Sequence, residues 1–210
     1  MFRVTLRDQK VGARIARNFG GDAVSEILVN VDTHRGPSFS LSNRLRRVLW
    51  GVAWVALFRW TPRPAHRWRA FVLRLFGAEV GRGSHVYPSV KIWAPWNVRI
   101  GEESGIGDGV NLYSMAPITV GDRVTISQGA HLCCGTHDIS DWGAPLLAFP
   151  ISIGNHAWIF AEAFLAPGVE IGEGAVVGAR SVVTKSMPAW MVCVGNPCRP
   201  IKPRIMKERR

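Results

Sequence analysis

Aliphatic residues recur at every sixth position between residues 80 and 183, and this period is the strongest pattern in the chain. An α-helix would return every 3.6 residues and a half-buried strand every second residue, so neither explains the spacing. A period of six is typical of a parallel β-helix, in which each hexad supplies one short strand and one corner. The aliphatic positions are Val80, Val86, Ile92, Val98, Ile100, Ile106, Leu112, Ile118, Val120, Ile126, Leu132, Ile153, Ile159, Leu165, Ile171, Val177 and Val183.

Small residues occupy the fifth place of most hexads, for example Ser84, Ala130 and Thr136. Three hexads close a triangular coil of about eighteen residues, whose inward aliphatic side chains stack on those of the next coil. The period slips by two residues from Val98 to Ile100 and from Ile118 to Val120, and we interpret each slip as an extra pair of corner residues. The pattern therefore predicts a mainly β protein with a β-helix over residues 80–190.

The repeat is interrupted between its third and fourth sets. Residues 138–152 leave the period entirely and contain Trp142, Gly143, Pro145 and Pro150. Because a solenoid keeps its coils uniform, a long excursion loop is a frequent place for a functional site. Residues 191–210, beyond the last coil, form a basic tail.

Residues 37–79 are rich in arginine and tryptophan, and no Asp or Glu occurs from Pro37 to Ala78. We expect two helices here. Ser42 or Asn43 would cap a helix that runs to about Phe58, and a second helix would end at Gly77.

These helices have two candidate roles. They would cap the open end of the β-helix, which is our preferred interpretation, and residues 42–76 would also suit peripheral contact with an anionic membrane. The apolar run is too short to span a bilayer. No nucleic-acid recognition motif accompanies the arginines, so we expect no nucleic-acid partner. Residues 1–36 are poorly readable, with one strand suggested by Ile27, Val29 and Val31.

The composition suits one globular domain with an appendage: 210 residues, 47% hydrophobic, with a formal net charge of +11. The four cysteines, of which Cys133 and Cys134 are adjacent, have no CxxC spacing and fit a reducing compartment. Residues 1–20 contain no signal-peptide core. We therefore expect a cytoplasmic protein, with the inner face of the cell membrane as an alternative location.

Several motifs together resemble the hexapeptide acyltransferases. They are Gly135–Asp138 before the excursion loop, Ile153–Ile159, Gly178–Lys185 and Gly195–Pro197. The sequence is most similar to the branch of colanic-acid-type exopolysaccharide O-acetyltransferases, which is related to the nodulation, maltose and galactoside acetyltransferases. The resemblance implies a left-handed parallel β-helix, a homotrimer, and acetyl-CoA bound between neighbouring prisms.

His137 lies where the repeat breaks and matches the catalytic histidine of this family. Transfer of an acetyl group to a hydroxyl needs a base, because a neutral alcohol attacks a thioester poorly, and histidine suits this role. We expect His137 to take the acceptor proton in a direct transfer. Asp138 is a candidate to orient the ring, although neighbours on a strand point to opposite sides, so the orienting group stays open.

The resemblance also implies contacts for coenzyme A. Small residues and cations of the last third of the chain match the family positions: Ala161, Ala179, Thr184, Lys185, Arg199 and Lys202. Repeat packing is the alternative explanation for the alanines, and ordinary solvated charge for Arg199 and Lys202.

For the acceptor we single out Asn111, Tyr113 and Trp142, which have the chemistry to hydrogen-bond or stack on a sugar ring. His131 and His156 could join His137 around zinc, but acetyl transfer needs no metal and we expect none.

The expected function is acetyl-CoA-dependent O-acetylation of a sugar or glycan, which could be lipid-linked, in exopolysaccharide biosynthesis. The alternatives are a small soluble acceptor such as a free sugar, an amino sugar or a xenobiotic, a non-catalytic trimeric scaffold, or a metal-dependent hydratase.

Overall fold

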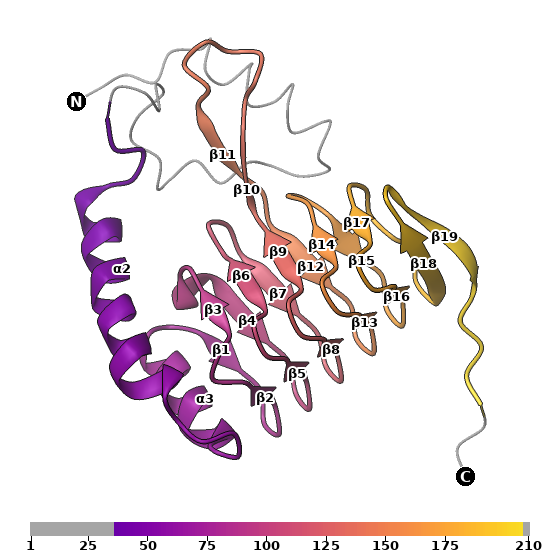
Figure 1. Cartoon of the computed structure of the whole chain (residues 1–210), viewed down its shortest axis with the longest axis horizontal. Coiled ribbons are helices and arrows are strands. Elements are labelled where there is room, and N and C mark those ends of the chain that lie inside the picture. The colour runs from indigo at the N-terminus through magenta and orange to yellow at the C-terminus, as the bar shows by residue number, and fades with distance from the viewer. Residues whose placement is uncertain (1–35, 208–210) are drawn as a thin grey trace.

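Three parallel β-sheets form the walls of a solenoid (Figure 1). The structure is a computed structural model that describes residues 36–207, so the strand expected around Val29 lies outside the described residues. The first wall contains β1 (Glu79–Val80), β4 (Val98–Ile100), β7 (Ile118–Val120), β12 (Ile151–Ile153) and β15 (Glu170–Ile171). The second contains β2 (His85–Val86), β5 (Gly105–Ile106), β8 (Thr125–Ile126), β13 (Trp158–Ile159), β16 (Val176–Val177) and β18 (Met191–Gly195). The third contains β3 (Lys91–Ile92), β6 (Asn111–Tyr113), β9 (His131–Cys133), β14 (Phe164–Leu165) and β17 (Val182–Val183).

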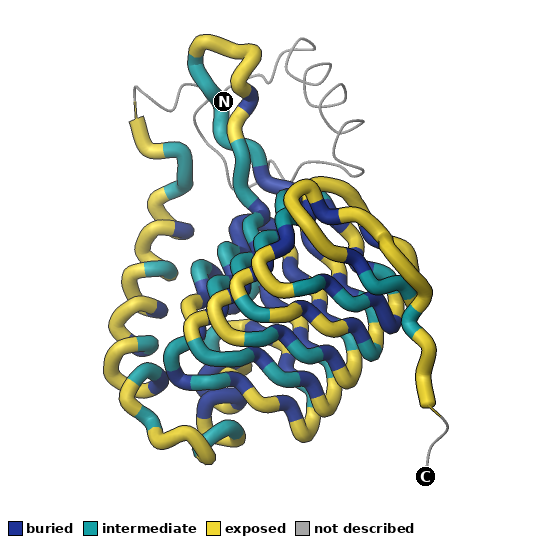
Figure 2. Tube along the Cα trace, turned by 45° about the vertical axis from the view of Figure 1, so that its right-hand side comes forward, coloured by how far each residue is buried: buried dark blue, intermediate teal, exposed yellow. Residues whose placement is uncertain are grey.

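The six-residue period is confirmed as the inward side of these walls. Every aliphatic position of the repeat is buried, and equivalent residues pair in register from coil to coil, as Val86 does with Ile106 and Ile106 with Ile126. Figure 2 shows the buried positions recurring along the inside of successive coils, while the corners are more exposed. The prediction of a mainly β solenoid with short N-terminal helices is therefore correct.

The interpretation of the two-residue slips is wrong. Val98 and Ile100 are both buried in β4 with Arg99 exposed between them, and β7 has the same pattern. Alternate residues of a strand face opposite sides, so each slip is a strand with two inward side chains and not an addition to a corner.

Two helices precede the first coil. Helix α2 (Leu41–Ala53) continues into a π-helical turn, η1 (Trp54–Arg59), and α3 (His66–Leu75) follows. The cap lies earlier than expected, because the Ser40 side chain accepts a hydrogen bond from Asn43 N at 3.3 Å. Gly77 has a φ of +89° directly after α3, as expected of a helix stop.

Side-chain donors on these helices cap the first coil. Backbone N–H groups of each coil donate to carbonyls of the following coil, as Gly81 N does to Ile100 O at 2.7 Å. The matching carbonyls of the first coil have no preceding coil to pair with. They accept from side chains instead: Arg74 Nε to Val80 O (3.0 Å), Arg69 Nε to Val86 O (2.6 Å), Trp54 Nε1 to Val90 O (2.9 Å) and Trp50 Nε1 to Ile92 O (2.7 Å). The preferred interpretation of these helices as a cap is confirmed.

The excursion is an antiparallel hairpin of β10 (Gly135–His137) and β11 (Leu146–Ala148), which projects from the solenoid (Figure 1). Thr136, which the period placed in a hexad, pairs with Leu147 in this hairpin. The coil resumes at Ile151, so the excursion begins and ends slightly earlier than residues 138–152. A short 3₁₀ helix, η2 (Pro95–Asn97), turns an earlier corner.

At the C-terminal end, β19 (Cys198–Pro203) runs antiparallel to β18 and returns the chain along the second wall. All four cysteines are free thiols.

Candidate active site

The hairpin holds His137 in one defined tautomer. The side chain is exposed, and its Nδ1 lies 2.7 Å from the carbonyl oxygen of Ala144 on the other side of the hairpin. A carbonyl only accepts hydrogen bonds, so Nδ1 carries the proton and donates. Nε2 of the neutral ring is then a proton acceptor, which is the state that a general base requires.

Asp138 does not orient this ring. Its buried carboxylate accepts hydrogen bonds from Ser140 N at 2.9 Å and from Ser140 Oγ at 2.6 Å, while its backbone N–H donates to Pro145 O. The carboxylate therefore shapes the turn of the hairpin. The group that orients the ring, which the sequence left open, is the backbone carbonyl of Ala144. Ala144 has a φ of +42°, which is unusual for a residue with a side chain.

Two of the proposed acceptor residues lie together on the outer face of the third wall. Asn111 Nδ2 is 3.3 Å from His131 Nε2 on the next coil, and the ring of Tyr113 meets that of His131 edge to face. Burial lowers the pKa of His131 and raises the pKa of Tyr113, so both side chains are neutral near pH 7. These side chains offer uncharged hydrogen-bonding groups, and Lys91 lies beside Asn111 on the same wall. Trp142, in contrast, is 100% exposed at the far end of the hairpin and joins none of them.

The six residues proposed for coenzyme A fall into three groups. Ala161 and Ala179 occupy stacked corners between the second and third walls, where Arg180 N donates to Ala161 O at 2.9 Å. Thr184 and Lys185 are exposed at the next corner, on the side from which the hairpin leaves, two coils further along. Coils are about 4.8 Å apart, so this pair lies about 10 Å along the axis from the hairpin base. Arg199 and Lys202 are exposed on β19.

The structure adds a groove that the sequence did not suggest. It lies over the outer face of the second wall, beside the returning C-terminal segment, and combines aromatic with basic side chains. Arg204 is fixed there, since its Nη1 donates to His156 O at 2.8 Å and to Gly174 O at 2.9 Å. In the sequence Arg204 is one more cation in a basic tail, and no pattern distinguishes it. The groove is lined by Arg123, Thr125, His156, Ala157, Trp158, Trp190, Arg204, Met206 and Lys207.

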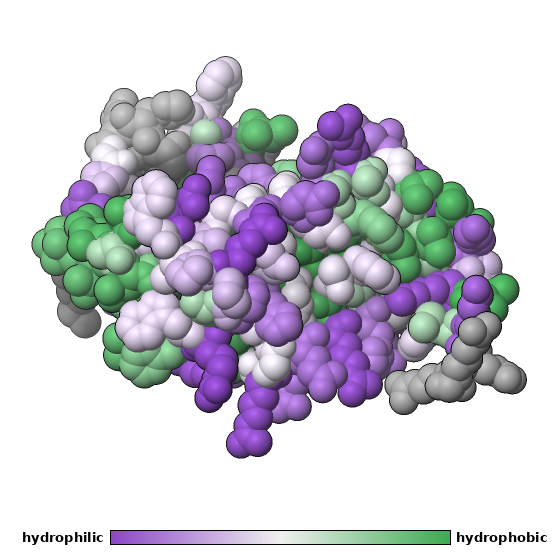
Figure 3. Space-filling model, turned by 60° about the horizontal axis from the view of Figure 1, so that its bottom comes forward, coloured by the Kyte–Doolittle hydropathy of each residue, from purple (hydrophilic) through white to green (hydrophobic). Residues whose placement is uncertain are grey.

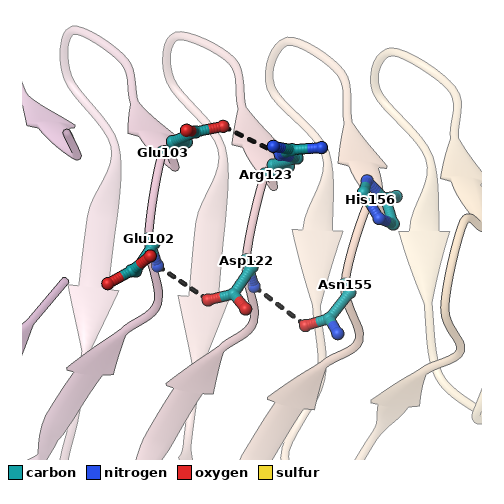
Figure 4. A pocket seen from close by; sticks show the side chains of 6 residues that line it. All are labelled: Glu102, Glu103, Asp122, Arg123, Asn155 and His156. Carbon is teal, nitrogen blue, oxygen red and sulfur yellow. Dashed lines mark hydrogen bonds and ion pairs between the residues drawn. The ribbon is translucent and has the colours of Figure 1, made fainter. Parts of the chain in front are cut away.

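A second hollow lies at the corners between the first and second walls (Figure 4). Its side chains pair with the neighbouring corners: Glu102 N donates to Asp122 Oδ1, Asp122 N donates to Asn155 Oδ1, and Arg123 pairs with Glu103 at 2.8 Å. This ladder stabilises the corners and leaves few groups for chemistry.

The three histidines considered for zinc are separated: His137 lies on the hairpin, His131 on the third wall and His156 at a corner beside the second wall. Among residues 36–207, no group of three or more His, Cys, Asp or Glu side chains has an arrangement that could hold a metal ion.

Comparisons with known proteins agree with this architecture. Residues 150–185 match the family model described as bacterial transferase hexapeptide (six repeats). The chain is 45% identical to the putative colanic acid biosynthesis acetyltransferase WcaF of Escherichia coli K12, over 81% of this chain and 93% of that protein. It is 31% identical to the galactoside O-acetyltransferase of the same organism, over 67% of this chain and 70% of that protein.

Solved structures show the same fold. A galactoside acetyltransferase in complex with coenzyme A matches with a TM-score of 0.73 and 26% identity, covering 91% of this chain and 90% of its own. A hexapeptide-repeat acetyltransferase from Vibrio cholerae, complexed with acetyl coenzyme A, matches with a TM-score of 0.73 and 26% identity, covering 80% of this chain and 91% of its own.

Proposed function

This chain belongs to the hexapeptide-repeat acetyltransferases, and we propose that it transfers an acetyl group from acetyl-CoA to a sugar hydroxyl in exopolysaccharide biosynthesis. The observation that carries the proposal is the tautomer of His137. Its Nδ1–H is held by the Ala144 carbonyl, which leaves Nε2 as a base on an exposed hairpin.

The proton transfer follows from this geometry. Acetyl-CoA supplies an activated acetyl thioester when bound. His137 Nε2 accepts the proton of the hydroxyl as its oxygen attacks the acetyl carbonyl, so that positive charge does not build up on the attacking oxygen, and later gives the proton to the departing sulfur. The Ala144 carbonyl also stabilises the imidazolium between these two steps, because the Nδ1–H hydrogen bond strengthens when the ring is charged.

The described residues offer a matching environment for the donor. Coenzyme A combines phosphates, an adenine ring and a slender pantetheine arm. Ala161 and Ala179 provide small side chains at adjacent corners, where a narrow arm has room to approach the backbone. Arg204 and Lys207 with Trp158 and Trp190 provide cations and flat aromatic surfaces in the groove over the second wall. Thr184, Lys185, Arg199 and Lys202 remain candidates for contacts to the phosphates or the arm.

We further propose a homotrimer. Ala161 and Ala179 lie at a different corner of the prism from the base of the hairpin, so a ligand that contacts both His137 and these alanines would bridge two prisms packed side by side. Trp142, fully exposed at the end of the hairpin, is placed to meet a neighbouring protomer or the acceptor. The four free thiols support a cytoplasmic location.

For the acceptor, the uncharged side chains of Asn111, His131 and Tyr113 suit hydrogen bonds to the hydroxyls of a sugar. The likeness to a colanic acid biosynthesis enzyme favours a sugar of a polysaccharide repeat unit. A free sugar is the second candidate, because the galactoside enzyme is also a relative.

The test compares His137→Gln with His85→Gln, an exposed histidine on the second wall. Thiol release from acetyl-CoA would be followed with repeat-unit oligosaccharides and with free sugars. We expect kcat of His137→Gln to fall by about 10²–10⁴-fold with little change in coenzyme A affinity, and His85→Gln to retain activity. If His137→Gln still transfers acetyl groups at the normal rate, His137 is not the general base. Activity with free sugars but not with the oligosaccharides would show that the acceptor is a small soluble molecule.

A further inference from the structure

The helices that cap the first coil present a second, unused surface. Apolar side chains on the side of α2, η1 and α3 that faces away from the solenoid are exposed, among them Val48 (65%), Val52 (63%) and Trp60 (77%). Figure 3 shows apolar side chains gathered at the helical end of the molecule, on the left of the view. We call this surface the outer apolar face; it consists of Leu41, Leu45, Val48, Leu49, Val52, Val55, Leu57, Trp60, Trp68, Phe71 and Leu75.

Capping does not require these residues. The donors to the first coil, Trp50, Trp54, Arg69 and Arg74, point toward the solenoid from the other side of the helices. Buried apolar residues such as Leu73 already pack against the coil. Within the chain segment that the structure describes, the outer apolar face therefore takes no part in the packing of the protomer, and a continuous exposed surface of this kind marks an interaction site.

The charges beside the face indicate the partner. Arg44 and Arg67 are exposed, and no acidic residue lies between residues 37 and 78. A two-fold contact in which this face meets its own copy would bring the same arginines together without a carboxylate from either helical region, which is unfavourable. A partner with a negatively charged surface and an apolar interior beneath it would complement the outer apolar face and its arginines.

The helices are also too charged to span a bilayer. The continuous helical segment of α2 and η1 covers residues 41–59 and contains four arginines, Arg44, Arg46, Arg47 and Arg59. Within residues 36–207, no helix combines the length and apolar character needed to cross a membrane. Trp60, next to Arg59 with a cation–π separation of 5.2 Å, provides the amphipathic side chain that favours the headgroup region.

We propose that the outer apolar face binds in the plane of a bilayer rich in anionic lipids, with the arginines at the headgroups and the aliphatic side chains below them. This contact is independent of the identity of the acceptor. It would bring the acetyltransferase to substrates that are carried on lipids.

Co-sedimentation of the full-length protein with vesicles tests the proposal. Vesicles of phosphatidylcholine alone are compared with vesicles that also contain phosphatidylglycerol, at low and at high salt. The apolar variant is Val48→Ser/Val52→Ser, and its matched control, Ile201→Ser/Ile205→Ser, removes two exposed aliphatic residues near the C-terminus. The charge variant is Arg44→Gln/Arg67→Gln, matched by Arg82→Gln/Arg99→Gln on the solenoid.

We expect binding to phosphatidylglycerol vesicles to fall at least tenfold in the apolar variant, and to fall severalfold in the charge variant only at low salt. Both controls should bind like the unmodified protein, and circular dichroism and transferase activity should confirm that all variants fold. Absence of binding at low salt, or equal losses in the controls, would overturn the proposal. A drop in molar mass of the apolar variant by light scattering, without vesicle binding by the parent, would assign the face to a second copy. Loss of transferase activity in His137→Gln with vesicle binding intact keeps the two proposals separable.

Discussion

The cap of the first coil makes a quantitative prediction for three tryptophans that differ in burial. Trp50 is 3% exposed and donates its indole N–H to Ile92 O at 2.7 Å. Replacing it by phenylalanine keeps an aromatic ring but removes the donor. Water cannot easily reach the carbonyl that is left behind, so the buried acceptor becomes unsatisfied.

An unsatisfied buried acceptor costs about 1–3 kcal/mol. We expect Trp50→Phe to lower the free energy of unfolding by that amount, plus a smaller loss from reduced contact with Phe76, whose ring centroid is 5.2 Å away. Trp54→Phe removes the same kind of bond to Val90 O, but Trp54 is only half-buried, so water can replace the donor and the loss should be about 1 kcal/mol or less. Trp60→Phe, at 77% exposure, should change the free energy by no more than about 0.5 kcal/mol.

The measurement is guanidinium unfolding followed by far-ultraviolet circular dichroism, because the chain has nine tryptophans and fluorescence would change with each substitution. Protein concentration must be equal throughout, since association with other protomers would add to the apparent stability. Equal losses for Trp50→Phe and Trp60→Phe would refute the reasoning that side-chain donors satisfy the carbonyls of the first coil.

Three further predictions concern the hairpin and the coils. Asp138→Asn keeps an acceptor for Ser140 and should retain most activity, whereas Asp138→Ala should reduce kcat severalfold; similar large losses in both would instead indicate a role for the carboxylate charge. Burial raises the pKa of Cys134 to about 12, so the folded state keeps a proton that the unfolded chain loses above about pH 9. The free energy of unfolding should therefore fall by up to about 1.4 kcal/mol per pH unit from this thiol between pH 9 and 12, and urea titrations of Cys134→Ala should show a shallower decline. A Cβ on Gly172 would lie 2.4 Å from Ala189 N, so Gly172→Ala should lower the midpoint of thermal unfolding by several degrees, and an unchanged midpoint would contradict this close approach.

The hairpin shows where sequence reasoning succeeds and where it stops. The interruption of the period next to His137 was visible because a solenoid repeats one residue pattern per coil. The sequence did not predict that the excursion folds as a hairpin, because β10 and β11 are short and carry no alternation that continues the repeat. Asp138 and Ala144 illustrate the limit, because the sequence offered Asp138 as a candidate and left the orienting group open, whereas a backbone carbonyl seven residues away holds the ring.

The sequence by itself determined the solenoid, the two helices before it and the position of the break, because each depends on which residue types recur at fixed spacing along the chain. Only the tertiary structure decided which group orients His137, which donors close the first coil, and that Arg204 lines a groove with Trp158 and Trp190. These features depend on backbone carbonyls or on segments brought together by the returning chain. A carbonyl belongs to every residue alike, so no sequence pattern marks the one that a side chain will contact.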